Sequence, residues 1–566
     1  MSDNLIPMDF SKLLDVVLND YKKHKKIFEI EENNFYRYEK DISIDYLGNK
    51  LVSPIGPAAG PHTQLAQNII TAYLTGSRYF EVKTVQVVDG IDMQKMIAKP
   101  CIDAKNVGYN VEWSTELTVE NAMEQYIYAS CLIEAMAKEL QISNDKDFII
   151  NISVGYDLEG IKSQKIDSFI ENLKDASNTN AFKNAIAILK ENIGRFSNLT
   201  VEDVDNISPN ISNIVTLSTM HGCKKEEIKS IATYLIENKK MNTFVKLNPT
   251  LLGYDNVRKI LDDLGYNSIE LSKTDFENDL QFDDAVKLVK DLKEISDRNG
   301  LTSGIKITNT LPVYNTREKL SGDKMYLSGK PLFPIAIGVA KKFFEAFPEL
   351  HISFSGGIDK ENVSKVLETG IMPATFSTIL LKPRGYLNTI NIAKKVEQIQ
   401  DLELGKLNLE KLTKLIEETN TSENYKNKGE KETLNDQLTE FDCFKTSCGI
   451  CVDTCPNRAN IKLEVPNLSA SYQIIHLDSR CNECGNCADF CPKGGKPYFK
   501  KITIFENEVD FKHSNNPGLK RLDGSKYLIR GIEGEIAEIE IDIEEESSDL
   551  FMTTVKELIK KYPYLF

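Results

Sequence analysis

The strongest chemical signal in the sequence is a crowding of cysteines between residues 443 and 491, which holds eight of the chain's 11 cysteines. They form two runs that each end in Cys-Pro: Cys443, Cys448, Cys451 and Cys455, then Cys481, Cys484, Cys487 and Cys491. The second run has the spacing C-x2-C-x2-C-x3-C-P, which is typical of ligands to 4Fe-4S clusters. The segment therefore predicts a ferredoxin-like module that carries single electrons.

In two-cluster ferredoxins the closing cysteine of each run binds the other cluster. This assigns Cys443, Cys448, Cys451 and Cys491 to one 4Fe-4S cluster, and Cys481, Cys484, Cys487 and Cys455 to the second. The first run has two extra residues between its first two cysteines, so Cys443 fits the pattern least well. A pair of zinc sites is the alternative, since zinc sites also use C-x2-C.

The residues before the cysteines alternate between short β-rich runs and amphipathic helical stretches, from residue 50 to about 395. The eight β-rich runs are residues 50–56, 79–86, 147–155, 214–222, 242–250, 304–310, 351–357 and 373–381. We expect an α/β fold, an eight-fold β/α (TIM) barrel. A doubly wound open sheet is the alternative, but glycine and polar residues follow nearly every run, as at the active end of a barrel.

The chain divides into four expected segments: a barrel with an N-terminal extension (1–395), a charged linker or solvated helix (396–440), the cluster module (441–500) and a C-terminal α+β appendage (501–566). In the appendage, residues 534–549 alternate apolar and acidic residues, which indicates a strand with one face in water. A helix is expected to follow over residues 549–562.

A flavin would convert single electrons into pairs, and the barrel has residues suited to bind one. The phosphate of FMN needs backbone N–H groups in tight turns. Gly356 and Gly357 follow the seventh run, and Ser377 and Thr378 lie on the eighth, at the common phosphate position of these barrels.

Two lysines, Lys83 and Lys246, end different runs. Either could stabilise negative charge at the edge of a reduced flavin. A surface salt bridge is the ordinary alternative for each.

The stretches "AAGP", "KT", "VKLNP", "TNT", "LSGKPLFPIA" and "SGGID" resemble the dihydroorotate dehydrogenase family, especially the FMN barrel of dihydropyrimidine dehydrogenase. With the glycine turns above, the resemblance implies FMN contacts at Ala58, Ala59, Gly60, Lys83, Thr84, Asn151, Lys246, Thr308, Ser328, Gly329, Gly356, Gly357, Ser377 and Thr378. It implies substrate contacts at Asn151, Asn248, Asn309 and Thr310.

The cysteine segment, with "GKPY" and "NNPG", also resembles bacterial iron-sulfur flavoproteins assigned as selenate reductase subunits, which implies an association with purine-catabolic enzymes. The larger relatives carry an FAD- and NADPH-binding section, but no G-x-G-x-x-G follows a predicted strand here. We therefore expect a separate FAD-containing, NAD(P)H-oxidising subunit and a hetero-oligomer.

The loop "TLSTMHGC" (216–223) corresponds to the segment that carries the catalytic Cys or Ser in the resembled family. The alignment places Thr219 at that position, and an unactivated hydroxyl is a poor proton donor. A thiol near pKa 8.5 or an imidazole near 6.5 is better suited, so Cys223 or His221 could take over. The start of the next helix should lower the pKa of Cys223, although a small residue that only caps that helix is the alternative.

The net charge of −15 argues against a nucleic-acid partner. The N-terminus lacks a basic region before an apolar core, and no apolar run is long enough to span a membrane, so we expect a cytoplasmic protein. The interpretation is an FMN- and iron-sulfur-dependent reductase of a purine or related cyclic amide. The alternative is an electron-transfer subunit with a degraded barrel that serves a molybdenum or selenium enzyme.

Overall fold

A computed structural model describes residues 4–219, 221–400, 402, 406–429, 438–441, 443, 448–466, 468 and 470–566. Its largest sheet has eight parallel strands in the order β5-β16-β15-β12-β11-β10-β9-β6. Their bounds are β5 (Ile55–Pro57), β6 (Tyr79–Glu81), β9 (Ile149–Val154), β10 (Ile214–Ser218), β11 (Asn242–Leu247), β12 (Ser303–Ile307), β15 (His351–Ser355) and β16 (Ala374–Phe376). Each strand overlaps one of the eight predicted runs, and only β5 and β12 extend beyond theirs, by one residue each, so the predicted TIM barrel is confirmed.

The first and last strands of this sheet meet and nearly close the barrel. The Arg78 N–H donates to the Ile55 carbonyl over 2.9 Å. The two strands approach so closely at Gly56 that a Cβ there would lie 1.7 Å from the Tyr79 carbonyl oxygen. Glycine is therefore required where the barrel closes.

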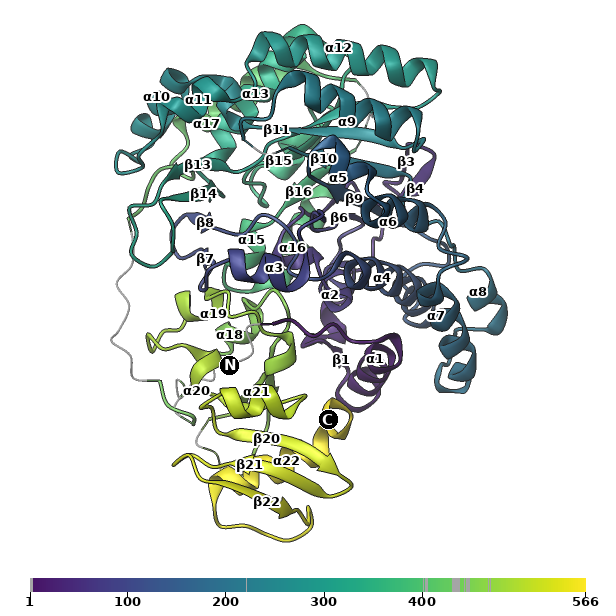
Figure 1. Cartoon of the computed structure of the whole chain (residues 1–566), viewed down its shortest axis with the longest axis vertical. Coiled ribbons are helices and arrows are strands. Elements are labelled where there is room, and N and C mark those ends of the chain that lie inside the picture. Colours follow the sequence, from purple (N-terminus) through teal and green to yellow (C-terminus); the bar gives the residue numbers. More distant parts are fainter. Residues whose placement is uncertain are drawn as a thin grey trace.

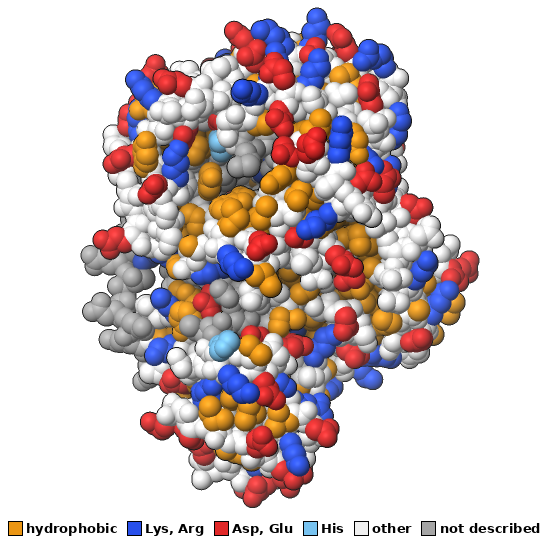
Figure 2. Space-filling model, in the orientation of Figure 1, with side chains coloured by type: hydrophobic (Ala, Val, Ile, Leu, Met, Phe, Trp, Pro, Cys, Tyr) orange, Lys and Arg blue, Asp and Glu red, His pale blue; other side chains and the backbone are white. Residues whose placement is uncertain are grey.

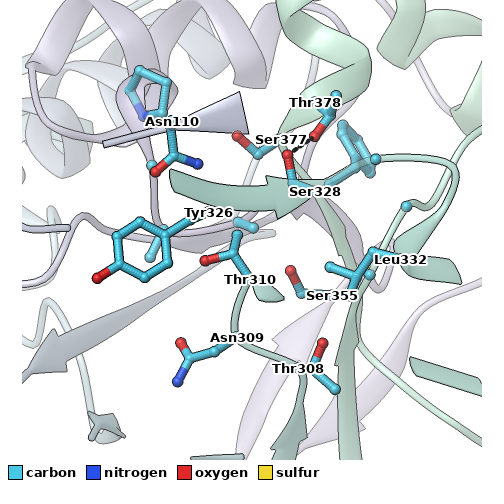
Figure 3. Close-up of a pocket in the computed structure, with 18 of the residues that line it drawn as sticks. Asn110, Thr308, Asn309, Thr310, Tyr326, Ser328, Leu332, Ser355, Ser377 and Thr378 are labelled. Carbon is cyan, nitrogen blue, oxygen red and sulfur yellow. Dashed lines mark hydrogen bonds between the residues drawn. The ribbon is translucent and has the colours of Figure 1, made fainter. Parts of the chain in front are cut away.

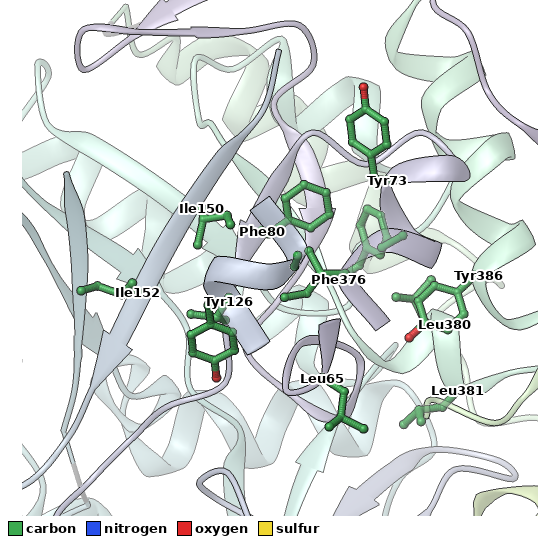
Figure 4. Packing of buried hydrophobic residues seen from close by; sticks show 14 of the residues in the cluster. Leu65, Tyr73, Phe80, Tyr126, Ile150, Ile152, Phe376, Leu380, Leu381 and Tyr386 are labelled. Atoms are coloured by element: carbon green, nitrogen blue, oxygen red, sulfur yellow. The ribbon is translucent and has the colours of Figure 1, made fainter. Parts of the chain in front are cut away.

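Helices surround the barrel strands (Figure 1). They are α2 (Ala66–Leu74), α3 (Gly90–Met96), α4 (Val119–Glu139), α5 (Leu158–Lys162), α6 (Gln164–Lys174), α7 (Asn180–Glu191), α8 (Val201–Asp205), α9 (Lys225–Glu237), α10 (Tyr254–Asp263), α11 (Lys273–Asn278), α12 (Phe282–Arg298), α13 (Leu332–Ala346), α14 (Val363–Leu367), α15 (Thr378–Leu381) and α16 (Asn388–Val396). Figure 4 shows Phe80, Phe376 and Tyr126 in the core that these elements enclose.

A second sheet, of four antiparallel strands in the order β13-β14-β8-β7, was not predicted. It comprises β7 (Ile102–Asp103), β8 (Gly108–Asn110), β13 (Leu311–Tyr314) and β14 (Lys324–Ser328). These strands belong to insertions after β6 and β12, at the carboxyl ends of the barrel strands. We call them the mouth sheet.

The C-terminal part contains a six-stranded sheet, β17-β18-β19-β20-β21-β22. Its strands are β17 (Asn460–Leu463), β18 (Gln473–Leu477), β19 (Ile502–Ile504), β20 (Gly518–Asp523), β21 (Lys526–Arg530) and β22 (Ile536–Glu540), and its helices are α18 (Ile450–Asp453), α19 (Asn486–Asp489), α20 (Pro497–Lys500), α21 (Glu508–His513) and α22 (Leu550–Lys561). Because β18 pairs with β19, residues 501–566 extend the sheet of the cysteine segment.

The predicted helix over residues 549–562 corresponds to α22. The prediction that the acidic strand buries one face is wrong, because all five residues of β22 are exposed. Ile536 is 55% and Ile539 36% exposed. The strand lies at the edge of the sheet, so the alternation of residue types does not correspond to a covered face.

The segment predicted as a charged linker contains a helix that packs on the barrel. This helix is α17 (Leu409–Thr421), which buries Leu412 and Leu415 and contacts α13. A solvated helix is therefore the wrong description for these residues, because their apolar side chains cover the barrel.

The N-terminal helix α1 (Phe10–His24) joins the barrel to the C-terminal part (Figure 1). The hydroxyl of Tyr564 donates to Asp20 over 2.5 Å, and the N–H of Ile6 donates to the Ser479 carbonyl over 2.8 Å. Acidic and basic side chains are mixed over the face shown in Figure 2. None of the helices in the described ranges is both long and apolar enough to cross a membrane.

Candidate active site

A cavity of about 550 Å³ lies at the carboxyl ends of the barrel strands, within the roughly 300–1,000 Å³ range of small-molecule sites. Most of the predicted site residues line it. They are Ala58, Ala59, Gly60, Lys83, Thr84, Thr219, His221, Lys246, Thr308, Asn309, Thr310, Ser328, Gly329, Gly356, Gly357, Ser377 and Thr378.

Three predicted site residues do not line this cavity: Asn151, Asn248 and Cys223. The Asn151 amide lies inside the barrel and donates to the Tyr79 hydroxyl and to Thr216 Oγ1, each over 2.9 Å. Asn248 lies behind the cavity wall, where its Oδ1 accepts from Asn309 Nδ2 over 2.7 Å. Asn248 therefore orients a cavity residue from behind.

One end of the cavity is a cradle made by two glycines and two hydroxyl residues. Gly329 and Gly357 both have φ of +78°, and a Cβ on Gly357 would lie 2.4 Å from the Gly329 carbonyl oxygen. The hydroxyls of Ser328 and Thr378 are 2.8 Å apart (Figure 3). Backbone that no side chain covers, together with hydroxyl donors, suits a phosphate group. The cradle fits the phosphate of FMN.

The two predicted lysines differ in their partners. Lys83 Nζ forms a buried ion pair with Glu112 Oε2 at 2.9 Å, which neutralises its charge. The Nζ atom of Lys246 has no hydrogen-bond or ion-pair partner among the residues that the structure describes. Burial, and then repulsion from Lys306, lowers the pKa of Lys246 to about 8, while Glu81 opposes the shift. An unpaired cation in the cavity wall fits a ligand with an electron-rich edge.

We expect this unpaired lysine to give the flavin-free protein a measurable pH dependence. Relative to Lys246→Met, the wild-type free energy of unfolding should rise from about pH 8 to pH 10.5. Over that range only the unfolded chain keeps the Lys246 proton, so the penalty for a buried charge disappears as the pH rises. Urea unfolding across the range measures the difference, and parallel curves for the two proteins would contradict it.

The loop after β10 separates the two candidate proton donors. His221 lines the cavity, whereas the half-buried thiol of Cys223 does not. The expected lowering of the Cys223 pKa is wrong: burial, with a contribution from Glu227, raises it to about 11. Thr219 Oγ1 donates to the Lys246 carbonyl over 3.4 Å.

Several cavity residues on or beside the mouth sheet were not predicted from the sequence. These are Tyr109, Asn110, Trp113 and Tyr326. Trp113 is the single tryptophan of the chain and is 45% exposed. A lone aromatic residue in an insertion was the only available signal. Together these side chains add flat apolar surfaces and an amide to the cavity.

The eight predicted metal-ligand cysteines lie in two groups. Cys455 lines a small cavity together with Cys481, Cys484 and Cys487. The other three, Cys443, Cys448 and Cys491, lie near Cys451: burial raises the pKa of Cys451 well above its ordinary value, and repulsion from these three thiols adds to the shift. Within the described ranges, no three His, Cys, Asp or Glu side chains form a group that could hold a single metal ion.

The second cysteine run touches the wall of the large cavity. The Cys484 carbonyl accepts from the N–H groups of Cys101 and Ile102 over 3.2 and 3.0 Å, and Ile102 lines the cavity. The side chain of Asn486 donates to the carbonyl of Leu381, another cavity residue, over 3.0 Å. A cluster held by this run would therefore lie next to the cavity.

Comparison with known proteins agrees with this architecture. Residues 28–428 match the family model described as "Oxidoreductase YgfK, N-terminal TIM-barrel domain", and residues 421–495 match a 4Fe-4S dicluster domain. Fold and site thus define an oxidoreductase in which a TIM barrel precedes an iron-sulfur domain. The chain belongs to the YgfK oxidoreductase family.

Two relatives are the YgfK oxidoreductases of Escherichia coli strains K12 and O157:H7. Each is 38% identical over 483 residues, which cover 82% of this chain and 46% of the relative. The chain thus spans about half the length of the curated relatives that it matches. Two solved structures are of DHODH from Eimeria tenella, one with ferulenol and one ligand-free. Each has a TM-score of 0.38 and 14% identity. The match covers 64% of this chain in both cases, and 85% and 89% of the two DHODH chains.

Proposed function

We propose that this chain is an FMN- and iron-sulfur-dependent oxidoreductase subunit of the dihydropyrimidine dehydrogenase type that reduces a purine or related cyclic amide in the cytoplasm. Its electrons come from a separate FAD-containing, NAD(P)H-oxidising subunit and pass through two 4Fe-4S clusters. The contact between Cys484 and Ile102 carries this proposal, because it joins the cluster segment to a cavity suited to a flavin.

FMN, when bound, would supply the conversion between single electrons from the clusters and a hydride for the substrate. The cradle of Ser328, Gly329, Gly357 and Thr378 would hold its phosphate. Lys246 would lie where negative charge develops on the reduced ring. Ala58, Ala59 and Gly60 would leave room for the flat ring system.

The remaining cavity residues favour a flat substrate with carbonyl and N–H groups. Asn309 and Thr310 provide an amide and a hydroxyl, and Asn110 a second amide (Figure 3). Tyr326 and Trp113 provide aromatic surfaces for stacking. This combination of stacking surfaces and hydrogen-bonding groups is suited to a cyclic amide such as an oxopurine.

Anaerobic purification tests the proposal. The chain should contain about eight iron, eight sulfide and one FMN. NADH or NADPH alone should not bleach the flavin, since no dinucleotide fingerprint follows a strand. Adding the FAD-containing subunit should restore bleaching, and a panel of uracil, hypoxanthine, xanthine and urate should then contain an oxidant of the reduced protein.

Three results would contradict the proposal. Stoichiometric zinc without iron would exclude the clusters, and fully metallated protein without flavin would exclude the FMN site. Rapid bleaching by either nucleotide without a partner would exclude the separate subunit. If the protein holds flavin and clusters but no ring compound oxidises it, the alternative electron-transfer subunit is favoured. Thr219 supports this alternative, because it replaces the catalytic Cys or Ser that acts as the proton donor in the resembled family.

A further inference from the structure

Asp279 is a buried carboxylate directly after α11, next to the cavity loop. Its side chain is 1% exposed. Four donors surround its oxygens: His221 Nδ1 at 2.7 Å, the Gly222 N–H at 2.5 Å, Thr250 Oγ1 at 2.8 Å and Asn248 Nδ2 at 3.2 Å. These four donors hold the Asp279 carboxylate in one orientation. Because two of them come from His221 and Gly222, they also hold the loop after β10 in place.

The protonation of this group of residues follows from its contacts. Burial works against ionisation of Asp279, but hydrogen bonds from His221, Thr250 and Gly222 hold its pKa below the usual value. An ionised carboxylate can only accept hydrogen bonds, so Nδ1 of His221 must carry the proton.

Nε2 of His221 is the remaining ring nitrogen, and it has no hydrogen-bond partner within the described part of the chain. The ring lines the cavity and lies parallel to that of Tyr326, with the centroids 6.3 Å apart and an interplanar angle of 17°. Asp279 and Tyr326 therefore restrain the imidazole from two directions.

We propose that Asp279 is a positioning residue that fixes the His221 ring through Nδ1, so that Nε2 donates a proton to the substrate in the cavity. The catalytic part of this inference rests on the proposed function. A carboxylate that holds a histidine in one tautomer and stabilises its protonated form is a known arrangement for proton transfer. In this chain the Asp279–His221 pair lies at the carboxyl ends of the barrel strands, and the proposed proton transfer does not involve Cys223.

The chemistry balances when a C=C or C=N bond of the ring is reduced. A bound, reduced flavin would supply a hydride, which is two electrons and a proton, to one carbon. The neighbouring atom gains the second proton from Nε2, so the double bond becomes a single bond. The neutral imidazole then recovers a proton from solvent, and the carboxylate of Asp279 stays ionised throughout.

Nitrogen NMR of protein labelled with 15N-histidine tests the positioning directly and needs no substrate. The His221→Gln variant identifies the His221 signals among the six histidines. In the wild type we expect the neutral ring to be the Nδ1–H tautomer, with Nε2 unprotonated. Asp279→Asn should abolish this pattern, whereas the exposed Asp283→Asn, four residues further along the chain, should preserve it.

The catalytic part is measured by mixing anaerobically reduced protein with the four ring compounds and following flavin oxidation. For the most reactive compound, His221→Gln and Asp279→Asn should oxidise roughly 10²- to 10⁴-fold more slowly, the usual contribution of a positioned general acid. Oxidation by ferricyanide, which takes electrons without a proton, should be unchanged in both, and flavin and iron contents should match those of the wild type.

A wild-type spectrum in which the neutral ring is the Nε2–H tautomer would overturn the positioning role, whatever the variants do. Wild-type oxidation rates in His221→Gln, or a loss as large in Cys223→Ala, would overturn the role of His221. If none of the four compounds oxidises the wild-type protein, the proposed function fails, and the spectrum alone decides whether Asp279 fixes His221.

Discussion

Gly357→Leu should abolish flavin binding while the iron and sulfide contents stay at the wild-type level. Gly357 has φ of +78°, a conformation that costs an ordinary residue roughly 1–2 kcal/mol. A Cβ would also lie 2.4 Å from the Gly329 carbonyl oxygen, so the two turns of the cradle must separate. Each 1.4 kcal/mol of lost binding free energy lowers the affinity about tenfold. The backbone cost and the displaced cradle together should therefore weaken FMN binding so far that the flavin is lost on gel filtration.

The matched control is Gly300→Leu, which also adds a side chain at positive φ in the barrel. Gly300 has φ of +64° and nothing within 4 Å of the added Cβ. Gly300→Leu therefore has the conformational cost of a positive φ but no steric clash, so this variant should retain flavin. Retention of FMN by Gly357→Leu at the wild-type level would show that the cradle is not the phosphate site, and equal loss in both variants would indicate a general loss of the fold.

Much of the barrel could be predicted because each strand is short, β-rich and followed by glycine or polar residues. The carboxyl ends of parallel strands meet at one end of the barrel, so residues as distant as Ala58 and Thr378 were correctly expected to lie together. Asn151 lies within β9, two residues after its start, and its side chain points into the barrel instead of the mouth.

The rest could not be predicted, because it depends on pairing between distant insertions. The mouth-sheet strands are two to five residues long, and β8 and β14 are more than 200 residues apart in the chain. No periodicity in such short segments indicates their partners. Asp279 lies in the acidic stretch "TDFENDLQFDD", where nothing distinguishes it from its exposed neighbours until the fold places His221 beside it.

The largest stability effect is expected from Glu81→Leu, at the centre of the barrel. Glu81 and Lys306 form an ion pair in which both side chains are almost fully buried, and Thr375 donates to Glu81 Oε2 over 3.2 Å. Removing the carboxylate leaves the ammonium group buried without its counter-charge, which typically costs about 3–5 kcal/mol. Urea unfolding followed by fluorescence of the single tryptophan, Trp113, reports on the barrel.

The double variant Glu81→Leu/Lys306→Met separates a broken pair from a damaged core. Replacing a whole buried ion pair by apolar side chains is often neutral or stabilising, because neither charge then has to leave water. The double variant should therefore regain most of the free energy of unfolding that Glu81→Leu loses. If the single and double variants are equally unstable, the loss comes from packing around Glu81. If Glu81→Leu is as stable as the wild type, the charge of Lys306 is not left unpaired, because its ammonium group has another partner or has lost its proton. Lys306 and Glu81 also act on the pKa of Lys246, so the same two variants tell whether the charges inside the barrel set the charge of this cavity residue.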